Sequence, residues 1–289
     1  MVILEKNVPL WQKTTFKIGG PADIVVYPET AQELAEWMKK ESASFVLGGG
    51  SNILVADKGI RGAIISLTRG FMDMRIEKQK DGAISAHVGA GALLTKISSK
   101  LMESSIAGLE FGYGIPGTVG GALIMNAGAL GGEMKDVVES VTYVTQNGDI
   151  KTLNNKECGF SYRSSAFPDG CVITETKLRL KEGDKQKIHE DMRQKYMSRK
   201  SSQPLDLPSA GSVFKNPDGD FAGRLIESAG LKGVAHGGAK ISEKHANFIV
   251  NTGGAKAADV LCLIEKTEDI VNKNFGISLK REVRLAGEF

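Results

Sequence analysis

The chain has 289 residues, of which 41% are hydrophobic and 25% are charged, and its formal net charge is +3. These values are ordinary for a globular protein with room for two or three domains, and so small a charge argues against nucleic-acid binding. The three cysteines form no CxxC pair, which favours reduced thiols over a disulfide framework or a zinc site. Glu5 and Lys6 follow a very short apolar run, so the N-terminus does not resemble a signal peptide.

Short strands and one helix are predicted at the start of the chain. Residues 14–23 alternate at Phe16 and Ile18 and then turn at two glycines and a proline, which predicts a short strand. Residues 24–27 (IVVY) predict a second strand. Thr30 and Glu33 then form a capping box, which predicts the start of an amphipathic helix.

Residues 45–57 read FVLGGGSNILVAD and predict a strand, a tight loop and a second strand. A dinucleotide fingerprint of the Rossmann type would need GxGxxG at the start of a helix, and neither the spacing nor the following β-branched residues fit. One interpretation is that loop amides hold a phosphate, with Ser51 and Asn52 adding side-chain donors. The alternative is a plain hairpin turn.

Residues 62–67 and 83–88 alternate like strands. Gly89-Ala90-Gly91 then precedes Leu94, Ile97 and Leu101, whose spacing predicts one apolar face of a helix.

Residues 108–132 read GLEFGYGIPGTVGGALIMNAGALGG, in which nine of 25 residues are glycine. The uncharged run between Glu110 and Glu133 is long enough to span a bilayer. We reject a membrane helix, because glycine costs about 1 kcal/mol and proline about 3 kcal/mol in a helix. The stretch is either a buried loop without a ligand or a cradle of backbone N–H groups for an anionic cofactor, with Asn126 as its main polar side chain.

Residues 137–145 and 149–153 flank Gln146-Asn147-Gly148, which predicts a β-hairpin. In residues 158–167 (CGFSYRSSAF), Arg163 could form a fork to a carboxylate or phosphate, or it could be a surface arginine packed on aromatic rings. Residues 172–180 predict a strand. The charged segment 183–200 predicts a helix and a domain boundary.

In the last third, Ser212 lies among small residues, where a serine usually only satisfies the backbone. Asp220 is predicted to cap a helix, a strand is predicted over 246–250, and a long helix over 258–275. His236 and His245 lack the spacing of metal ligands, so no metal site is predicted. Residues 277–285 alternate like a strand, and by pattern alone Glu282 is a charge on its wet side.

Eight segments together resemble the UDP-N-acetylenolpyruvoylglucosamine reductases, the flavin enzymes of peptidoglycan precursor synthesis known as the MurB family. They are TTFKIGGPAD (14–23), LGGGSNILVAD (47–57), GIPGTVGGALIMNAGA (114–129), FSYRSSAF (160–167), QPLDLPSAGSVFKNP (203–217), AGRLIESAGLKG (222–233), HANFIVN (245–251) and EVRLAG (282–287). The segments span essentially the whole chain. The compact region after Val213 resembles the shorter type of the family, without the tyrosine-bearing insertion.

The resemblance implies an α+β fold. It comprises an FAD-binding region of two subdomains, similar to the vanillyl-alcohol-oxidase (PCMH-like) group, and a C-terminal α/β substrate-binding domain. We place the FAD-binding region at 1–183, with subdomains at about 1–68 and 69–183, and the substrate-binding domain at 184–289. The implied enzyme is a cytoplasmic UDP-N-acetylmuramate dehydrogenase without membrane insertion. It uses NADPH as co-substrate and FAD to reduce UDP-N-acetylglucosamine enolpyruvate.

The resemblance also implies roles for individual residues. Arg163 matches the active-site arginine, Ser212 the proton donor and Glu282 the active-site glutamate. The substrate-binding candidates are Tyr162, Lys215, Asn216 and, more weakly, Arg224. The positions that match FAD contacts are Gly48, Gly49, Gly50, Ser51, Asn52, Pro116, Gly117, Thr118, Gly120, Gly121 and Asn126.

Two rival functions are weighed against this one. Another FAD-dependent oxidoreductase, such as an alcohol or sugar oxidase, would match the flavin scaffold only up to about residue 180, and the C-terminal segments argue against it. A non-catalytic flavin- or nucleotide-binding module would not need Arg163, Ser212 and Glu282 together.

Overall fold

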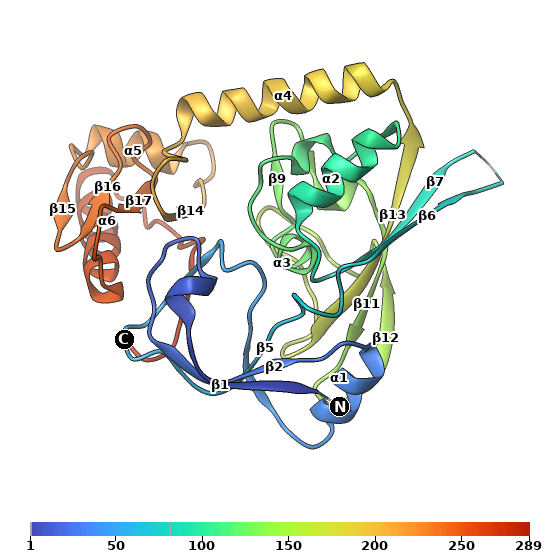
Figure 1. Cartoon of the computed structure of the whole chain (residues 1–289). Coiled ribbons are helices and arrows are strands. Elements are labelled where there is room, and N and C mark those ends of the chain that lie inside the picture. The colour runs from blue at the N-terminus through green and yellow to red at the C-terminus, as the bar shows by residue number, and fades with distance from the viewer. Residues whose placement is uncertain (1, 81) are drawn as a thin grey trace. The chain divides into compact units, whose positions relative to one another are not determined.

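The computed structural model describes residues 2–80 and 82–289, and the chain divides into two compact units (Figure 1). Unit 1 comprises the described residues up to Glu5, together with Ile24–Gly49 and Ala63–Ser198. Unit 2 comprises Lys6–Asp23, Gly50–Gly62 and Arg199–Phe289. Most of the buried apolar side chains form two clusters, one within each unit, so each unit has a hydrophobic core of its own.

The main sheet of unit 1 is built around β13. Its strand order is β12-β11-β13-β7-β6, and β8 also pairs with β13. All these pairs are antiparallel. The strands are β6 (Met74–Lys78), β7 (Ile84–Gly89), β8 (Ile106–Ala107), β11 (Val138–Val144), β12 (Ile150–Asn154) and β13 (Val172–Glu182). The predicted hairpin at Gln146-Asn147-Gly148 is confirmed, because it joins β11 to β12.

Unit 1 also contains helices, and those that begin at residues 31, 94 and 185 form where the sequence predicts helices. The helices of this unit are α1 (Ala31–Met38), α2 (Leu94–Glu103), α3 (Val119–Ile124) and α4 (Lys185–Ser202, counted with unit 2 from Arg199), with the 3-10 helices η2 (Glu110–Gly112) and η3 (Met134–Asp136). At the start of α1, the Thr30 hydroxyl accepts a hydrogen bond from the N–H of Glu33 at 3.1 Å, as the capping box predicts. α3 packs against β7 and β13 (Figure 1).

The glycine-rich stretch 108–132 contains short elements as well as loops. Besides η2 and α3, it holds the strand β9 (Gly128–Ala129) and the first residue of β10 (Gly132–Glu133), and these two strands pair. The composition argued against a helix here. α3 nevertheless forms, because Val119, Ala122 and Leu123 are buried in the core and Thr118 caps its first turn. Tertiary packing therefore outweighs the low helix propensity of glycine.

A four-stranded sheet has the order β1-β2-β5-β3. Its strands are β1 (Ile3–Pro9), β2 (Pro21–Tyr27), β5 (Ile60–Ile65) and β3 (Ala43–Val46). β3 runs parallel to β5, whereas β4 (Ile53–Val55) runs parallel to β18 (Arg284–Ala286). The strand–loop–strand prediction for residues 45–57 is thus confirmed. The plain-hairpin interpretation is wrong, because β3 and β4 belong to different sheets.

Residues 14–20 do not form the predicted strand. The N–H of Lys17 donates to the Thr14 carbonyl at 3.3 Å, and Lys17 has a φ of 56°, so the chain turns here. Phe16 and Ile18 are nevertheless both buried. The alternation in the sequence therefore reports burial on either side of a turn, and not the pleat of a strand.

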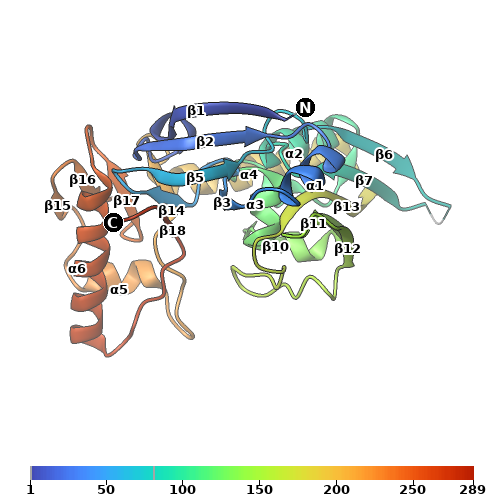
Figure 2. The same ribbon diagram turned by 90° about the horizontal axis from the view of Figure 1, so that it is seen from below.

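Unit 2 combines a small antiparallel sheet with α5 (Ala222–Ser228) and α6 (Ala257–Phe275). The sheet has the order β14-β17-β16-β15, with β14 (Ser209–Ser212), β15 (Ala235–His236), β16 (Ala239–Ile241) and β17 (Phe248–Asn251), and η1 (Leu10–Lys13) also lies in this unit. α6 packs on β15 and β16, and α5 packs on α6 (Figure 2). α6 ends at Gly276 with a φ of 69°, as the predicted helix does.

The strand predicted over residues 277–285 is mostly irregular, and only β18 forms a regular ladder. The burial pattern is nevertheless as predicted, with Leu279 and Val283 buried and Arg284 exposed. Before β18, this segment forms an isolated bridge between Arg281 and Phe214, and the N–H of Lys215 donates to the Lys280 carbonyl at 2.8 Å.

Candidate active site

The two predicted cofactor segments of unit 1 lie against each other. A Cβ atom added to Gly48 would stand 2.7 Å from Thr118 Oγ1, and one added to Gly49 would stand 2.6 Å from the Cα of Gly117. Both distances are shorter than real Cβ contacts, so glycine is required at these positions by close packing. The structure thus joins segments that are about 70 residues apart in the sequence.

The first amides of α3 are already hydrogen-bonded within the protein. The N–H of Val119 donates to the Ala92 carbonyl, and that of Gly120 to the Ala90 carbonyl, both at 2.8 Å. The N–H of Gly121 donates to Thr118 Oγ1 at 3.4 Å. The predicted cradle of backbone amides therefore does not extend over these residues.

Gly121 provides the test of whether a bulky cofactor fits this surface. It is exposed, and a Cβ atom added to it would meet only Thr118 Oγ1, at 3.6 Å. Gly120, by contrast, has Ala90 Cβ only 3.1 Å from where its own Cβ would lie. Packing within the protein explains Gly120 but not Gly121. The bare backbone at Gly121 suits a group that approaches this turn closely, as a flavin nucleotide would.

Arg163 lies in a tight turn of unit 1. Ser161 and Ser164 each donate a backbone hydrogen bond to the other's carbonyl, and Arg163 between them has a φ of 52°. Its Nη2 donates to the Gly128 carbonyl at 2.8 Å, and its guanidinium lies 5.4 Å from the ring centre of Tyr162. Tyr162 itself is 52% exposed, so its ring is available to a ligand.

The side chain of Asn126 is fully buried and engaged on both sides. Its Nδ2 donates to Glu133 Oε2 at 2.7 Å and to the Ser161 carbonyl at 3.0 Å. Its Oδ1 accepts from the N–H of Lys135 at 2.9 Å. Both amide hydrogens therefore form hydrogen bonds within the protein. Glu133 was not predicted as a site residue. The feature of the sequence that could have indicated it is its position as the first charged residue after the uncharged run.

In unit 2, Ser212 and Glu282 are brought together through the backbone. The N–H of Glu282 donates at 2.7 Å to the carbonyl of Val213, the residue after Ser212. Ser212 faces Phe248 in the β14–β17 pair, which has an irregular register between Ser209 and Ser212. Gly211 has a φ of 77° in this irregularity. Such bulges re-aim side chains next to active sites.

Asn247 braces the same segment and was not singled out from the sequence. It is buried, its Nδ2 donates to the Phe214 carbonyl at 2.8 Å, and its Oδ1 accepts from the Phe214 N–H at 3.0 Å. The side-chain amide thus replaces a neighbouring strand just after Ser212. Its only sequence signal is its place in the HANFIVN segment.

Gly50 and Asn52 lie in unit 2, as does Ser51. Gly50 has a φ of 63°, and its carbonyl accepts from the N–H of Thr15 at 3.0 Å. Nδ2 of Asn52 donates to the Glu282 carbonyl at 3.1 Å. The glycine loop is therefore linked directly to the segment that carries the predicted glutamate.

The substrate-binding candidates Lys215, Asn216 and Arg224 lie in or near the loop before α5. The N-cap position of α5 is Phe221 and not Asp220 as predicted, and Oδ1 of Asn216 accepts from the first helical N–H, that of Ala222, at 3.1 Å. Asp220 instead accepts from the N–H of Phe221 and holds the guanidinium of Arg224, whose hydrogen bond lowers the pKa of Asp220 to about 2. Arg224 is thus engaged by a carboxylate.

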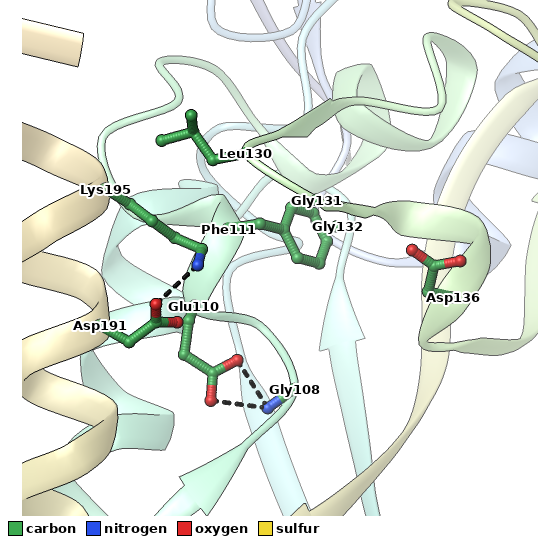
Figure 3. Close-up of a pocket in the computed structure, with 9 residues that line it drawn as sticks. All are labelled: Gly108, Glu110, Phe111, Leu130, Gly131, Gly132, Asp136, Asp191 and Lys195. Atoms are coloured by element: carbon green, nitrogen blue, oxygen red, sulfur yellow. Dashed lines mark hydrogen bonds and ion pairs between the residues drawn. The ribbon is translucent and has the colours of Figure 1, made fainter. Parts of the chain in front are cut away.

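A cavity of about 240 Å³ in unit 1 does not coincide with these residues (Figure 3). It is lined by Gly108, Glu110, Phe111, Leu130, Gly131, Gly132, Asp136, Asp191 and Lys195. Lys195 donates to Asp191 at 2.6 Å, and Glu110 accepts from the N–H of Gly108. Three carboxylates against one ammonium group disfavour an anionic ligand here.

Within residues 2–80 and 82–289, no group of three or more His, Cys, Asp or Glu side chains could hold a metal ion. The cysteines Cys158, Cys171 and Cys262 are free. Burial raises the pKa of the Cys158 and Cys171 thiols to about 11. In the same described part of the chain, none of the helices is long and apolar enough to cross a membrane.

Comparisons with known proteins match both parts of the chain. An FAD binding domain family matches residues 22–154, and the UDP-N-acetylenolpyruvoylglucosamine reductase C-terminal domain matches residues 203–286. The UDP-N-acetylenolpyruvoylglucosamine reductase of Agathobacter rectalis is 43% identical over 297 residues, covering 99% of this chain and 95% of the relative. The chain belongs to the UDP-N-acetylenolpyruvoylglucosamine reductase family. The reductase of Alkaliphilus oremlandii is 46% identical over 293 residues, covering 100% of this chain and 94% of the relative.

A solved structure supports the same assignment. The reductase (MurB) from Thermus caldophilus has a TM-score of 0.86 and 38% identity, and the match covers 99% of this chain and 100% of that one. The predicted fold class, an FAD-binding domain followed by the family's C-terminal domain, is confirmed. The enzyme is an FAD-dependent UDP-N-acetylmuramate dehydrogenase of peptidoglycan synthesis that uses NADPH.

Proposed function

We propose that Arg163, Ser212 and Glu282 carry out the reduction of UDP-N-acetylglucosamine enolpyruvate in this enzyme. The observation that carries the proposal is the 2.7 Å hydrogen bond from the N–H of Glu282 to the carbonyl of Val213, next to Ser212. It joins, within one unit, the two residues assigned to proton chemistry. Arg163 contributes from its strained turn in unit 1.

FAD would be held by Gly48–Asn52 and by Pro116, Gly117, Thr118, Gly120 and Gly121. When bound, it would supply the hydride chemistry that links NADPH to the substrate. The accessible backbone at Gly121 supports this placement. Asn126 stabilises the neighbouring backbone, because its side chain forms hydrogen bonds with Glu133, Lys135 and Ser161.

The chain's own residues act on the charge and the proton. Hydride addition to the methylene carbon drives electron density toward the substrate carboxylate. The Arg163 guanidinium stabilises that charge, since it is always ionised and donates as a planar fork. Ser212 protonates the adjacent carbon, and Glu282 orders the site or shares that proton. Tyr162, Lys215 and Asn216 bind the substrate, with Arg224 a weaker contributor because Asp220 engages it.

The finer assignments rest on further observations. We assign the enzyme to the shorter type, and the short link of residues 213–221 between β14 and α5 supports this assignment. We assign residues 1–183 to the FAD-binding region, with subdomains at about 1–68 and 69–183, and residues 184–289 to the substrate-binding domain. The start of α4 at Lys185 supports this boundary, whereas residues 6–23 and 50–62 group with unit 2. Three free thiols suit the reducing cytoplasm. The small net charge supports small-molecule partners and not nucleic acid.

The test is a visible absorption spectrum of the purified protein, followed by anaerobic NADPH and then the enolpyruvyl substrate. We expect flavin bands that bleach with NADPH and return with the substrate. Bands that return only with oxygen would favour an oxidase on the same scaffold. A colourless protein that takes up no added FAD would overturn the assignment of the glycine segments.

A further inference from the structure

We infer that Asn126 is the positioning residue that sets the turn carrying Arg163. The inference rests on the proposed role of Arg163. Asn126 donates one amide hydrogen to the Ser161 carbonyl, at the start of that turn, and the other to Glu133. A buried side chain that uses both hydrogens and its oxygen has one fixed orientation.

The contacts form a closed ring. Arg163 Nη2 donates to the carbonyl of Gly128, and Gly128 faces Glu133 in the β9–β10 pair. Glu133 in turn accepts from Asn126, which returns to the arginine's own turn at Ser161. The guanidinium is therefore held at its tip by the hairpin and at its root by the turn. Asn126 is the side chain that joins these two supports.

Backbone strain is concentrated at the same place. In the part of the chain that the structure describes, six residues other than glycine have a positive φ, and three of them are Asn126, Leu130 and Arg163. Such conformations persist only where the surroundings over-determine them, and they cluster at functional sites. The ring of hydrogen bonds described above holds Asn126 and Arg163 in these conformations.

Glu133 fixes which way the Asn126 amide points. Because an ionised carboxylate only accepts hydrogen bonds, it must face Nδ2 and not Oδ1. Lys135 completes the arrangement, since its N–H donates to Oδ1 of Asn126 and its ammonium group pairs with Glu133, which raises the pKa of Lys135. The Asn126 amide has two functions: it donates to Glu133 and it donates to the Ser161 carbonyl. Exchanging the donor and the acceptor between residues 126 and 133 keeps the first hydrogen bond and removes the second.

The experiment compares Asn126→Asp, Glu133→Gln, the double variant and Arg163→Lys. Asn126→Asp loses both donors and faces Glu133 with a second carboxylate. Glu133→Gln still offers Asn126 an acceptor and is the matched control. The double variant restores a hydrogen bond between residues 126 and 133, now from Gln to Asp, but the Ser161 carbonyl loses its side-chain donor and keeps only the N–H of Ser164. If Asn126→Asp alone does not fold, the double variant still tests the hydrogen bond to Ser161.

Each protein is measured by thermal unfolding without FAD and by anaerobic stopped-flow of both half-reactions. We expect Asn126→Asp to slow flavin reoxidation by the enolpyruvyl substrate about 10²-fold, as a misplaced catalytic group does, with reduction by NADPH little changed. The double variant should regain the unfolding temperature but remain about tenfold slow in reoxidation, because the Ser161 link stays broken.

The outcomes separate this inference from the proposal it rests on. A slow Arg163→Lys beside an Asn126→Asp of normal rate would overturn the positioning role alone. Full recovery of rate in the double variant would also overturn it, because Asn126 would then act only on the hairpin. An Arg163→Lys that reoxidises at the wild-type rate would overturn the role of Arg163 and this inference with it.

Discussion

Asn52 holds Glu282 by its backbone. Nδ2 of Asn52 donates to the Glu282 carbonyl at 3.1 Å across 230 residues of sequence, and the N–H of Arg284 donates back to the Asn52 carbonyl at 3.1 Å. On its other side, the Glu282 N–H is bound to the Val213 carbonyl. The peptide groups of Glu282 are thus fixed from two directions before any ligand binds.

Replacing Asn52 by Asp removes the donor and sets a carboxylate against the Glu282 carbonyl. We expect the free energy of unfolding to fall by about 1 kcal/mol, the usual net contribution of one hydrogen bond, because this bond is only partly buried. Reoxidation by the enolpyruvyl substrate should slow by about tenfold, since a factor of ten is about 1.4 kcal/mol of misplaced stabilisation. Urea unfolding and stopped-flow absorbance measure the two effects.

Asn274→Asp is the matched control for Asn52→Asp. It makes the same chemical change at an exposed position in the last turn of α6, where a negative charge costs a few tenths of a kcal/mol to about 1 kcal/mol. It should leave reoxidation unchanged. If both variants reoxidise at the wild-type rate, the link from Asn52 does not order Glu282.

Ser212→Ala removes the proposed proton donor without altering the β14 backbone. Reoxidation by the enolpyruvyl substrate should slow by at least about 10²-fold, the usual contribution of a positioned proton donor. Reduction of the flavin by NADPH should stay fast, because that step needs no proton from Ser212. Ser228→Ala, at an exposed position of α5, is the control. Unimpaired reoxidation in Ser212→Ala would remove Ser212 from this role.

Gly121→Ala should have opposite effects on the protein with and without FAD. Without FAD, alanine raises helix propensity by up to about 1 kcal/mol in α3. The added Cβ meets only Thr118 Oγ1 at 3.6 Å, so the unfolding temperature should rise. With FAD, the methyl group occupies the surface that we assign to the cofactor, and the dissociation constant should increase about tenfold or more.

Gly120→Ala is the comparison for this prediction. Its Cβ would lie 3.1 Å from Ala90 Cβ and 3.2 Å from the Ala90 carbonyl, so it should gain no stability even without FAD. Fluorescence titration with FAD and thermal unfolding of the FAD-free protein distinguish the two variants. An unchanged FAD affinity in Gly121→Ala would mean that the cofactor does not approach this turn.

The sequence predicted the features that depend on near neighbours. The Thr30 cap of α1, the Asn-Gly hairpin and the apolar face of α6 are local patterns, and all three are confirmed. α3 was missed because its helix is stabilised by burial of Val119 and Leu123, which local propensity does not report. Asp220 was a reasonable cap by position, but its carboxylate is held by Arg224.

The site was predictable only in part, for the same reason. Family resemblance supplied Arg163, Ser212 and Glu282 as candidates, whereas residue patterns alone left them as surface or backbone groups. Local patterns cannot show which side chains form hydrogen bonds with residues far away in the sequence. Asn126 reaches Ser161 across 35 residues and Asn247 reaches Phe214 across 33. Such pairs follow from how strands and turns pack, so the structure is needed to find them.

His245 should make the stability of the enzyme depend on pH. Burial lowers the pKa of His245 below its ordinary value of 6.5. A backbone hydrogen bond partly opposes this effect, Lys232 adds a smaller lowering, and Glu227 raises the pKa least. The unfolded chain then takes up this proton at a higher pH than the folded chain does. The stability that His245 contributes is complete above pH 6.5 and is lost as the pH falls through the folded pKa.

The structure gives the same direction. Nδ1 of His245 accepts a hydrogen bond from the N–H of Asn247 at 3.2 Å, which a doubly protonated ring cannot do. We therefore expect the unfolding temperature to fall less between about pH 8 and about pH 5 in His245→Gln than in the wild type. His236→Gln, at an exposed position on β15, should retain the wild-type pH dependence. If His245→Gln loses as much stability on acidification as the wild type, the neutral ring is not what holds Asn247 and the strand beside Ser212.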